Sequence, residues 1–211
     1  MSDPVNEVEQ PQTYLVTPPA FDPAVYPAQL AAVLDAHEVA CVRLAMSSVD
    51  EDVLSRAADA VREVTHARDI ALVIDEHILM VERLGLDGVH LNDGARRVAK
   101  TRKMLGDDAI IGAFCGTSRH DGMSAGEAGA DYVSFGPAGA SALGDGNSVP
   151  AELFQWWSEV IEVPVVAEGM LEADTVRRLA PFVDFFAFGQ EIWAQERSEE
   201  ALGALAALYA A

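Results

Sequence analysis

The sequence predicts an α/β fold, a single (β/α)8 TIM barrel, from three observations. First, two phrases repeat one pattern of helix end, Gly turn, Asp and short apolar strand with a polar tip: Gly-Leu-Asp-Gly-Val-His-Leu-Asn-Asp at Gly85 to Asp93, and Glu-Ala-Gly-Ala-Asp-Tyr-Val-Ser-Phe-Gly-Pro at Glu127 to Pro137. Second, eight apolar strand candidates alternate with helical segments, which favours parallel strands and a closed barrel. Third, 211 residues suit one domain of that size. An open α/β sheet is the alternative, but the first strand is followed by prolines and lacks the Gly-rich turn of a dinucleotide site.

Each element follows from its local pattern. Strands are predicted where Val, Ile and Leu run together, at Tyr14 to Thr17, Val39 to Ala45, Ile70 to Ile74, Gly88 to Leu91, Ala109 to Phe114, Asp131 to Phe135, Pro164 to Ala167 and Asp184 to Phe188. Between them, apolar residues recur at the spacing of amphipathic helices. Residues 1–12 are polar and contain two prolines, so a flexible tail is predicted before a barrel domain of residues 13–211. The last helix, Glu199 to Ala211, carries an apolar stripe that core packing and a homodimer contact explain about equally well.

The charge balance argues against several classes of partner. The net charge is −20, with 34 acidic and 14 basic residues, which opposes binding to a nucleic-acid backbone. No stretch reaches the roughly 20 continuous apolar residues of a membrane span, and the N-terminus lacks the pattern of a signal peptide. We therefore expect no nucleic-acid partner, no membrane association and a cytoplasmic location.

Few residues offer covalent chemistry. Cys41 and Cys115 lie in apolar strand-like runs and are predicted to be buried and reduced. Lys100 and Lys103 are the only lysines, and they lie in a helical stretch away from the strand tips. Because the chemistry of such barrels lies at those tips, a lysine Schiff base is not expected, and the polar residues that follow the strands are the candidates for function.

Five phrases between Tyr14 and Trp193 carry a resemblance to a known family: Leu-Gly-Leu-Asp-Gly-Val-His-Leu, Ile-Ile-Gly-Ala, Ser-Arg-His, Ala-Gly-Glu-Ala-Gly-Ala-Asp-Tyr-Val-Ser-Phe-Gly-Pro and Val-Pro-Val-Val-Ala-Glu-Gly. In order and spacing they resemble the thiamine phosphate synthase and thiazole tautomerase (TenI-like) family. The resemblance implies a transferase of thiamine biosynthesis. The family's synthases join an aminopyrimidine methyl diphosphate to a thiazole phosphate with magnesium and release diphosphate. The ligand is then a small molecule at the C-terminal mouth of the barrel.

Compared with that family, the residues after strands two and three have changed. The family's inward-facing Gln, Arg and Lys correspond to Arg43, Ala45 and Ser47, so Arg43 is the ligand-binding candidate. Its alternative role is an ion pair with Asp75 or Glu168. The family's Asn-Asp-Arg corresponds to Asp75, Glu76 and His77, which suggests Asp75 as a ligand contact, Glu76 as a magnesium ligand and His77 as an acid–base group. Helix capping by Asp75 is the alternative.

After strand four, the family's Gly-Gln-x-Asp corresponds to Asn92, Asp93, Gly94 and Ala95. Asp93 is the second metal candidate, provided that the loop shifts by two residues. His90 should point into the barrel, either as a ligand contact or as a hydrogen-bonded core histidine.

The remaining candidates follow strands five to eight. Arg119 and His120 begin the helix after strand five, where they suit anion binding and proton transfer, or they accompany a Ser118 cap. After strand six, Ser141 is the hydroxyl of a Gly-rich loop that is predicted to be a flexible lid and that lacks the lysine of the family's Thr-x-Thr-Lys. Further candidates are the possible acid–base residue Glu168 and the ligand contacts Gly169 and Gln190.

Three functions remain open at this stage: a thiamine phosphate synthase, a different acid–base or metal-assisted barrel enzyme, and a non-catalytic ligand-binding relative. Because the family's phosphate-binding cations are largely missing, we expect the chain to be a divergent member that forms thiamine phosphate below family-like rates.

Overall fold

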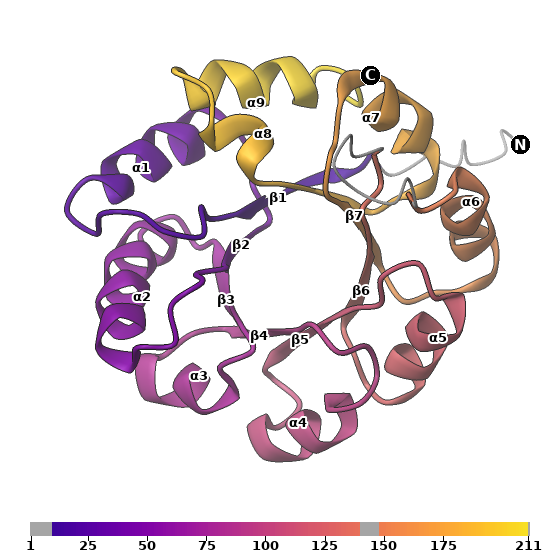
Figure 1. The fold of residues 1–211 in the computed structure, drawn as a ribbon, viewed down its shortest axis with the longest axis horizontal. Coiled ribbons are helices and arrows are strands. Elements are labelled where there is room, and N and C mark those ends of the chain that lie inside the picture. Colours follow the sequence, from indigo (N-terminus) through magenta and orange to yellow (C-terminus); the bar gives the residue numbers. More distant parts are fainter. Residues whose placement is uncertain (1–9, 140–147, 211) are drawn as a thin grey trace, which may run out of the picture.

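Eight apolar runs of the sequence form parallel strands that close into a barrel, in the residues that the computed structural model describes, 10–139 and 148–210 (Figure 1). The strands follow one another in chain order around the barrel, and β1 pairs with β8 to close it. In order, the elements are β1 Gln12–Val16, α1 Tyr26–Ala36, β2 Cys41–Leu44, α2 Glu51–His66, β3 Ala71–Asp75, α3 Ile78–Leu84, β4 Gly88–Leu91, α4 Val98–Leu105, β5 Ile110–Phe114, α5 Arg119–Glu127, β6 Tyr132–Phe135, α6 Ala151–Val160, β7 Val165–Glu168, α7 Ala173–Leu179, the 3-10 helix η1 Ala180–Phe182, β8 Phe185–Phe188, α8 Gln190–Trp193 and α9 Ser198–Ala206. The (β/α)8 prediction is confirmed.

The helices begin and end where the sequence supplies local signals. Asp50 caps α2, since its carboxylate accepts hydrogen bonds from the backbone N–H groups of Asp52 and Val53. Ser118 caps α5 in the same way. At the end of α3, Gly85 takes the left-handed conformation, with φ of 61°, which glycine adopts without steric cost. These signals fix where α2 and α5 begin and where α3 ends.

The aspartate in the phrase that repeats in the sequence has a structural role before β4, β6 and β8. Asp87, Asp131 and Asp184 each precede an even-numbered strand, and each carboxylate accepts a backbone N–H from the strand before it. The three bonds, to Leu72, Ile111 and Val165 of β3, β5 and β7, each measure 2.7 Å. The repeated aspartate therefore joins neighbouring strands at the N-terminal end of the barrel, opposite the mouth.

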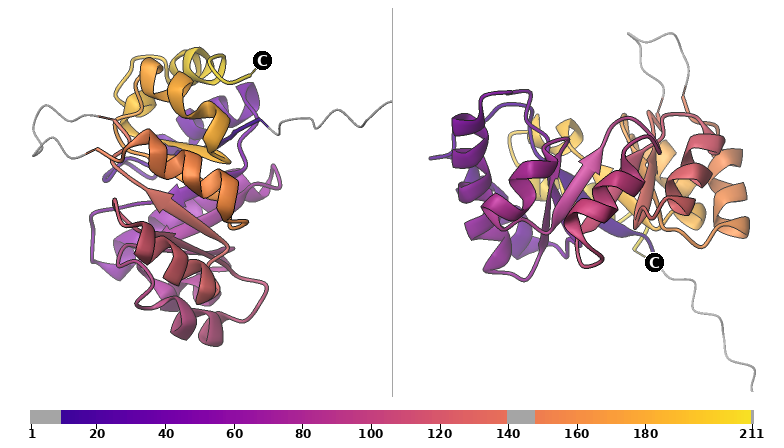
Figure 2. Two further views of the ribbon diagram at one scale, coloured as in Figure 1. Left: turned by 90° about the vertical axis from the view of Figure 1, so that its right-hand side faces the viewer. Right: turned by 90° about the horizontal axis from the view of Figure 1, so that it is seen from below.

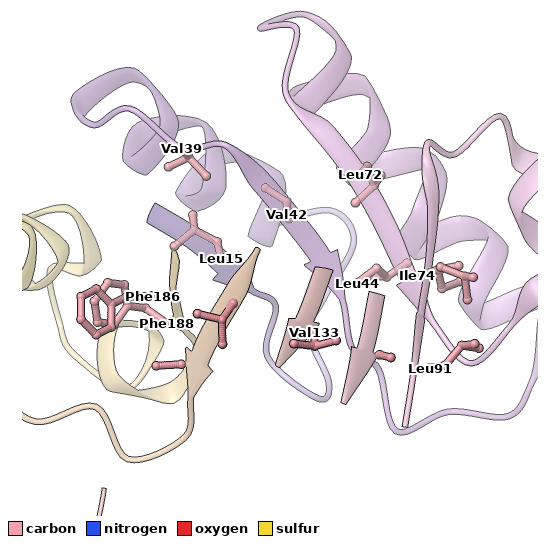
Figure 3. Packing of buried hydrophobic residues seen from close by; sticks show 14 of the residues in the cluster. Leu15, Val39, Val42, Leu44, Leu72, Ile74, Leu91, Val133, Phe186 and Phe188 are labelled. Carbon is pink, nitrogen blue, oxygen red and sulfur yellow. The ribbon is translucent and has the colours of Figure 1, made fainter. Parts of the chain in front are cut away.

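Apolar side chains fill two regions. Those that face outward from the strands pack beneath the helices, as Leu15, Val42 and Phe186 show in Figure 3. A smaller group fills the barrel itself: Tyr14, Cys41, Val73, Tyr132, Val166 and Ala187. Gly112 makes room there, because a Cβ at this position would lie 2.1 Å from the Cζ atom of Tyr132. The lower barrel is thus a packed core, and a ligand has to bind above it.

The helices form one layer around the barrel (Figure 1), and the side views in Figure 2 show them flanking the strands. The last of them, α9, packs against α1 and α8. The chain then continues to Tyr209, which is buried and shares a hydrogen bond of 2.7 Å with Thr13 of β1. Core packing therefore accounts for part of the apolar stripe predicted here. Within the described ranges, no helix has the length and apolar character that a bilayer crossing requires.

Both cysteines are buried and free, in agreement with the sequence. Burial raises the pKa of the Cys41 thiol to about 12 and that of the Cys115 thiol to about 12.

Candidate functional site

Arg43 lies at the centre of the barrel mouth, with only 8% of its surface exposed. It is carried by β2, and the residues that contact it come from β3, β4 and β7. Its Nη1 donates to the Oε2 atom of Glu168 at 2.8 Å and lies 2.8 Å from the Nε2 atom of His90. Its Nε lies 3.4 Å from the Oδ1 atom of Asp75, an ion pair without a hydrogen bond. The ion-pair alternative for Arg43 is therefore confirmed with both of the carboxylates that were named for it.

A line of hydrogen bonds continues from Arg43 into the barrel. A guanidinium can only donate, so Nε2 of His90 accepts, and the proton of the neutral imidazole is on Nδ1. Nδ1 lies 2.9 Å from the hydroxyl of Tyr132, which lies 2.7 Å from the hydroxyl of Tyr14. Burial, and then the charge of Arg43, lower the pKa of His90 well below its ordinary value. His90 is thus a neutral residue that holds Arg43 in place.

Asp75 and Glu168 face the mouth, with side-chain exposures of 21% and 15%. Burial raises the pKa of Asp75 to about 6, although Arg43 opposes this shift. The alternative role of Asp75 as the cap of α3 is wrong, since that helix begins only at Ile78 and the carboxylate turns toward Arg43. The mouth thus contains two carboxylates around one arginine.

A second ion cluster lies at the rim beside the first. Arg97, just before α4, donates from Nη2 to Oε2 of Glu76 at 2.5 Å and from Nε to Oδ2 of Asp93 at 2.7 Å. The structure thus brings together the two carboxylates that were proposed as metal ligands, but an arginine connects them. In residues 10–139 and 148–210, no group of three or more His, Cys, Asp or Glu side chains is arranged to hold a metal ion.

The other predicted residues are spread around the mouth. His77 is half-buried before α3, and Gln190 is exposed at the start of α8. Arg119 stacks its guanidinium 4.2 Å from the ring centre of Trp156 in α6, while His120 is exposed. The carbonyl of Gly169 accepts the backbone N–H groups of Ala138 and Gly139. Ser141 lies outside the described residues. Of the sequence candidates that the structure describes, only Arg43, Asp75, His90 and Glu168 gather at the centre of the mouth.

Sequence reasoning missed three kinds of residue. Arg97 was not considered, although its spacing of four from Asp93 is a signal for an ion pair. Tyr14 and Tyr132 were assigned to strands but not to a network. Ser134 lies two positions after Tyr132 and so faces the same side of β6, and its buried hydroxyl has no hydrogen-bond partner.

Comparisons with known proteins agree with this geometry. The family model described as thiamine monophosphate synthase matches residues 13–192. A thiamine-phosphate synthase of Rhodospirillum centenum is 39% identical over 184 residues, which cover 85% of this chain and 88% of that protein. One of Erythrobacter litoralis is 36% identical and covers 89% and 91%. The solved structure of a thiamine phosphate pyrophosphorylase from Pyrococcus furiosus superposes with a TM-score of 0.80 at 20% identity, over 94% of this chain and 95% of that one, and so supports the fold. The chain therefore belongs to the thiamine monophosphate synthase family.

Proposed function

We propose that this protein acts in thiamine biosynthesis as a divergent thiamine phosphate synthase. It joins an aminopyrimidine diphosphate to a thiazole phosphate, releases diphosphate, and does so slowly. The family match over residues 13–192 and the relatives at 36% and 39% identity support the reaction class. The small-molecule substrates enter the C-terminal mouth of the barrel.

The ion pairs of Arg43 and Arg97 at the mouth are the observation that supports the low rate. Arg43 contacts Glu168 and Asp75, and Arg97 contacts Glu76 and Asp93. Each arginine is therefore outweighed by two carboxylates, while the only two lysines of the chain lie in α4. Charge-assisted hydrogen bonds contribute about 1.5–3 kcal/mol each. A site that lacks two such bonds to a phosphate therefore binds that phosphate at least about a hundredfold more weakly.

Glu168 and Asp75 suit the part of the substrate that bears no phosphate. The amino group of an aminopyrimidine presents N–H donors, and a carboxylate in a shielded mouth is a strong acceptor for them. Arg43 holds both carboxylates in place from below. In this proposal Glu168 is the acid–base group at the centre, whereas His77 and His120 could transfer protons only from the rim.

Magnesium is implied by the family resemblance, and Glu76 and Asp93 are the residues that would hold it. Magnesium requires near-octahedral oxygen coordination. One oxygen of each carboxylate is already bonded to Arg97, and Oε1 of Glu76 accepts the backbone N–H of Asn92. As they are arranged, these residues do not fit a magnesium ion.

Initial rates of thiamine phosphate formation test the proposal when the Rhodospirillum centenum relative is measured in parallel with both substrates and magnesium. We expect product above the enzyme-free control, at about a hundredth of the relative's rate or less. Equal rates would contradict the loss of phosphate binding. An absence of product at every enzyme concentration would contradict the reaction itself.

A cytoplasmic location and a homodimer are the remaining parts of the proposal. The half-buried Leu205 and Leu208 near the end of the chain support a contact between two copies. Light scattering of the purified protein distinguishes the dimer from a monomer, and a monomeric mass would contradict it.

A further inference from the structure

Glu76 and Asp93 come from two different loops, after β3 and β4, and their carboxylates converge on one guanidinium. Arg97 uses Nη2 for Glu76 and Nε for Asp93, so two nitrogens of its planar head group each bond to one carboxylate. A lysine would offer both carboxylates the same nitrogen, whereas Arg97 offers each of them a nitrogen of its own. The arginine therefore bridges the two loops as a bound cation would.

The Glu76 side is firmly held. The backbone N–H of Glu76 donates to the carbonyl of His90 at 2.9 Å, and Oε1 of Glu76 accepts the N–H of Asn92 at 2.5 Å. Glu76 is also one of the few non-glycine residues in the described ranges with a positive φ, 64°. Its carboxylate is thus fixed toward Arg97 by contacts to β4 and the residue that follows it.

One carboxylate oxygen of Asp93 remains available to a cation. Oδ2 of Asp93 accepts from Arg97, whereas Oδ1 is buried and has no hydrogen-bond partner. A buried carboxylate oxygen without a partner is unfavourable. Removal of the guanidinium would leave both carboxylates at the rim without their cation.

We infer that Arg97 takes the place of the divalent cation at this mouth. It neutralises the pair Glu76 and Asp93 in part, so the wild-type protein binds no magnesium between them, and removing the guanidinium turns the pair into a divalent-cation site. The inference rests on the proposed function only for the choice of magnesium as the cation. Arg97 is a positioning residue that connects two loops of the mouth.

Thermal unfolding with and without magnesium chloride tests the role of Arg97, and this measurement does not depend on catalysis. The variant is Arg97→Gln, and the matched control is Arg96→Gln, an exposed neighbour with the same change of charge. We expect magnesium to raise the Tm of Arg97→Gln by at least about 2 °C more than that of Arg96→Gln or the wild type. The double variant Glu76→Gln/Arg97→Gln should lose this gain. An equal shift in the wild type, or no extra shift in Arg97→Gln, would overturn the inference.

A measurement on the wild type remains decisive if Arg97→Gln does not fold. Substoichiometric manganese broadens the NMR signals of residues close to a bound ion, and we expect those of Glu76 and Asp93 to broaden no more than those of exposed carboxylates elsewhere. Selective broadening at this pair would overturn the inference. Neither readout depends on catalysis, so an inactive protein would count against the proposed function alone.

Discussion

Arg43 and Glu168 show how a buried charge is accommodated at the scale of single residues. Arg43 is buried on β2, and Glu168 at the end of β7 lies beside it. A buried arginine without a counter-ion is strongly unfavourable, and so is a buried carboxylate without a cation. The two residues lie 2.8 Å apart, so each supplies the partner that the other requires.

Arg43 sets the tautomer of His90, and the hydroxyl of Tyr132 accepts the proton on Nδ1. We predict that Tyr132→Phe leaves the Nδ1–H of His90 buried without an acceptor and lowers the free energy of unfolding by about 1–3 kcal/mol. Urea unfolding measures the loss, and the ¹⁵N chemical shifts of His90 report which nitrogen carries the proton.

The control for that prediction is Tyr209→Phe, which removes the hydrogen bond to Thr13 at the opposite end of the barrel. It should destabilise the protein but leave the His90 signals unchanged. A proton on Nε2 of His90 in Tyr132→Phe would contradict the assignment of Nε2 as the acceptor of Arg43.

At the scale of elements, the repeated aspartates connect the strands in pairs. Each one accepts a backbone N–H from the preceding strand, so the connection does not depend on side-chain packing. This explains why the phrase that predicts the fold contains Asp before the strand. Its pattern could be recognised from the sequence, whereas its bonding partner could not, because the acceptor and the donor are up to 20 residues apart.

Asp184→Ala tests this role at β7 and β8. The change leaves the N–H of the fully buried Val165 without its acceptor, so we predict a loss of about 1–3 kcal/mol in the free energy of unfolding. Asp184→Asn retains a carbonyl oxygen and should recover much of the loss in the same chemical denaturation measurement. Equal stability of Asp184→Ala and the wild type would show that the bond contributes nothing.

At the scale of the whole molecule, the strands and the barrel could be predicted from the sequence, and about half of the site could not. Strand tips are marked by local apolar runs, so Arg43, Asp75, His90 and Glu168 were assigned to the mouth correctly. The direction of side chains that follow the strands depends on neighbouring loops and helices. Arg119 therefore stacks on Trp156, and Arg97 joins the loops after β3 and β4, contacts that no short stretch of sequence encodes.

The excess of acidic over basic residues in the whole chain is also found at the barrel mouth. The chain has 34 acidic and 14 basic residues, and at the mouth Arg43 and Arg97 are each paired with two carboxylates. The central claim is that these internal pairs, rather than a lack of arginine, are what weakens phosphate binding.

Calorimetric titration of inorganic diphosphate into the wild type and Glu168→Gln tests that claim most directly. Glu172→Gln, an exposed carboxylate with the same change of charge, is the control. We predict that Glu168→Gln removes one of the two carboxylates that pair with Arg43 and binds diphosphate at least about 10-fold tighter than the wild type and the control, which corresponds to about 1.4 kcal/mol. Wild-type binding as tight as that of Glu168→Gln would contradict the account.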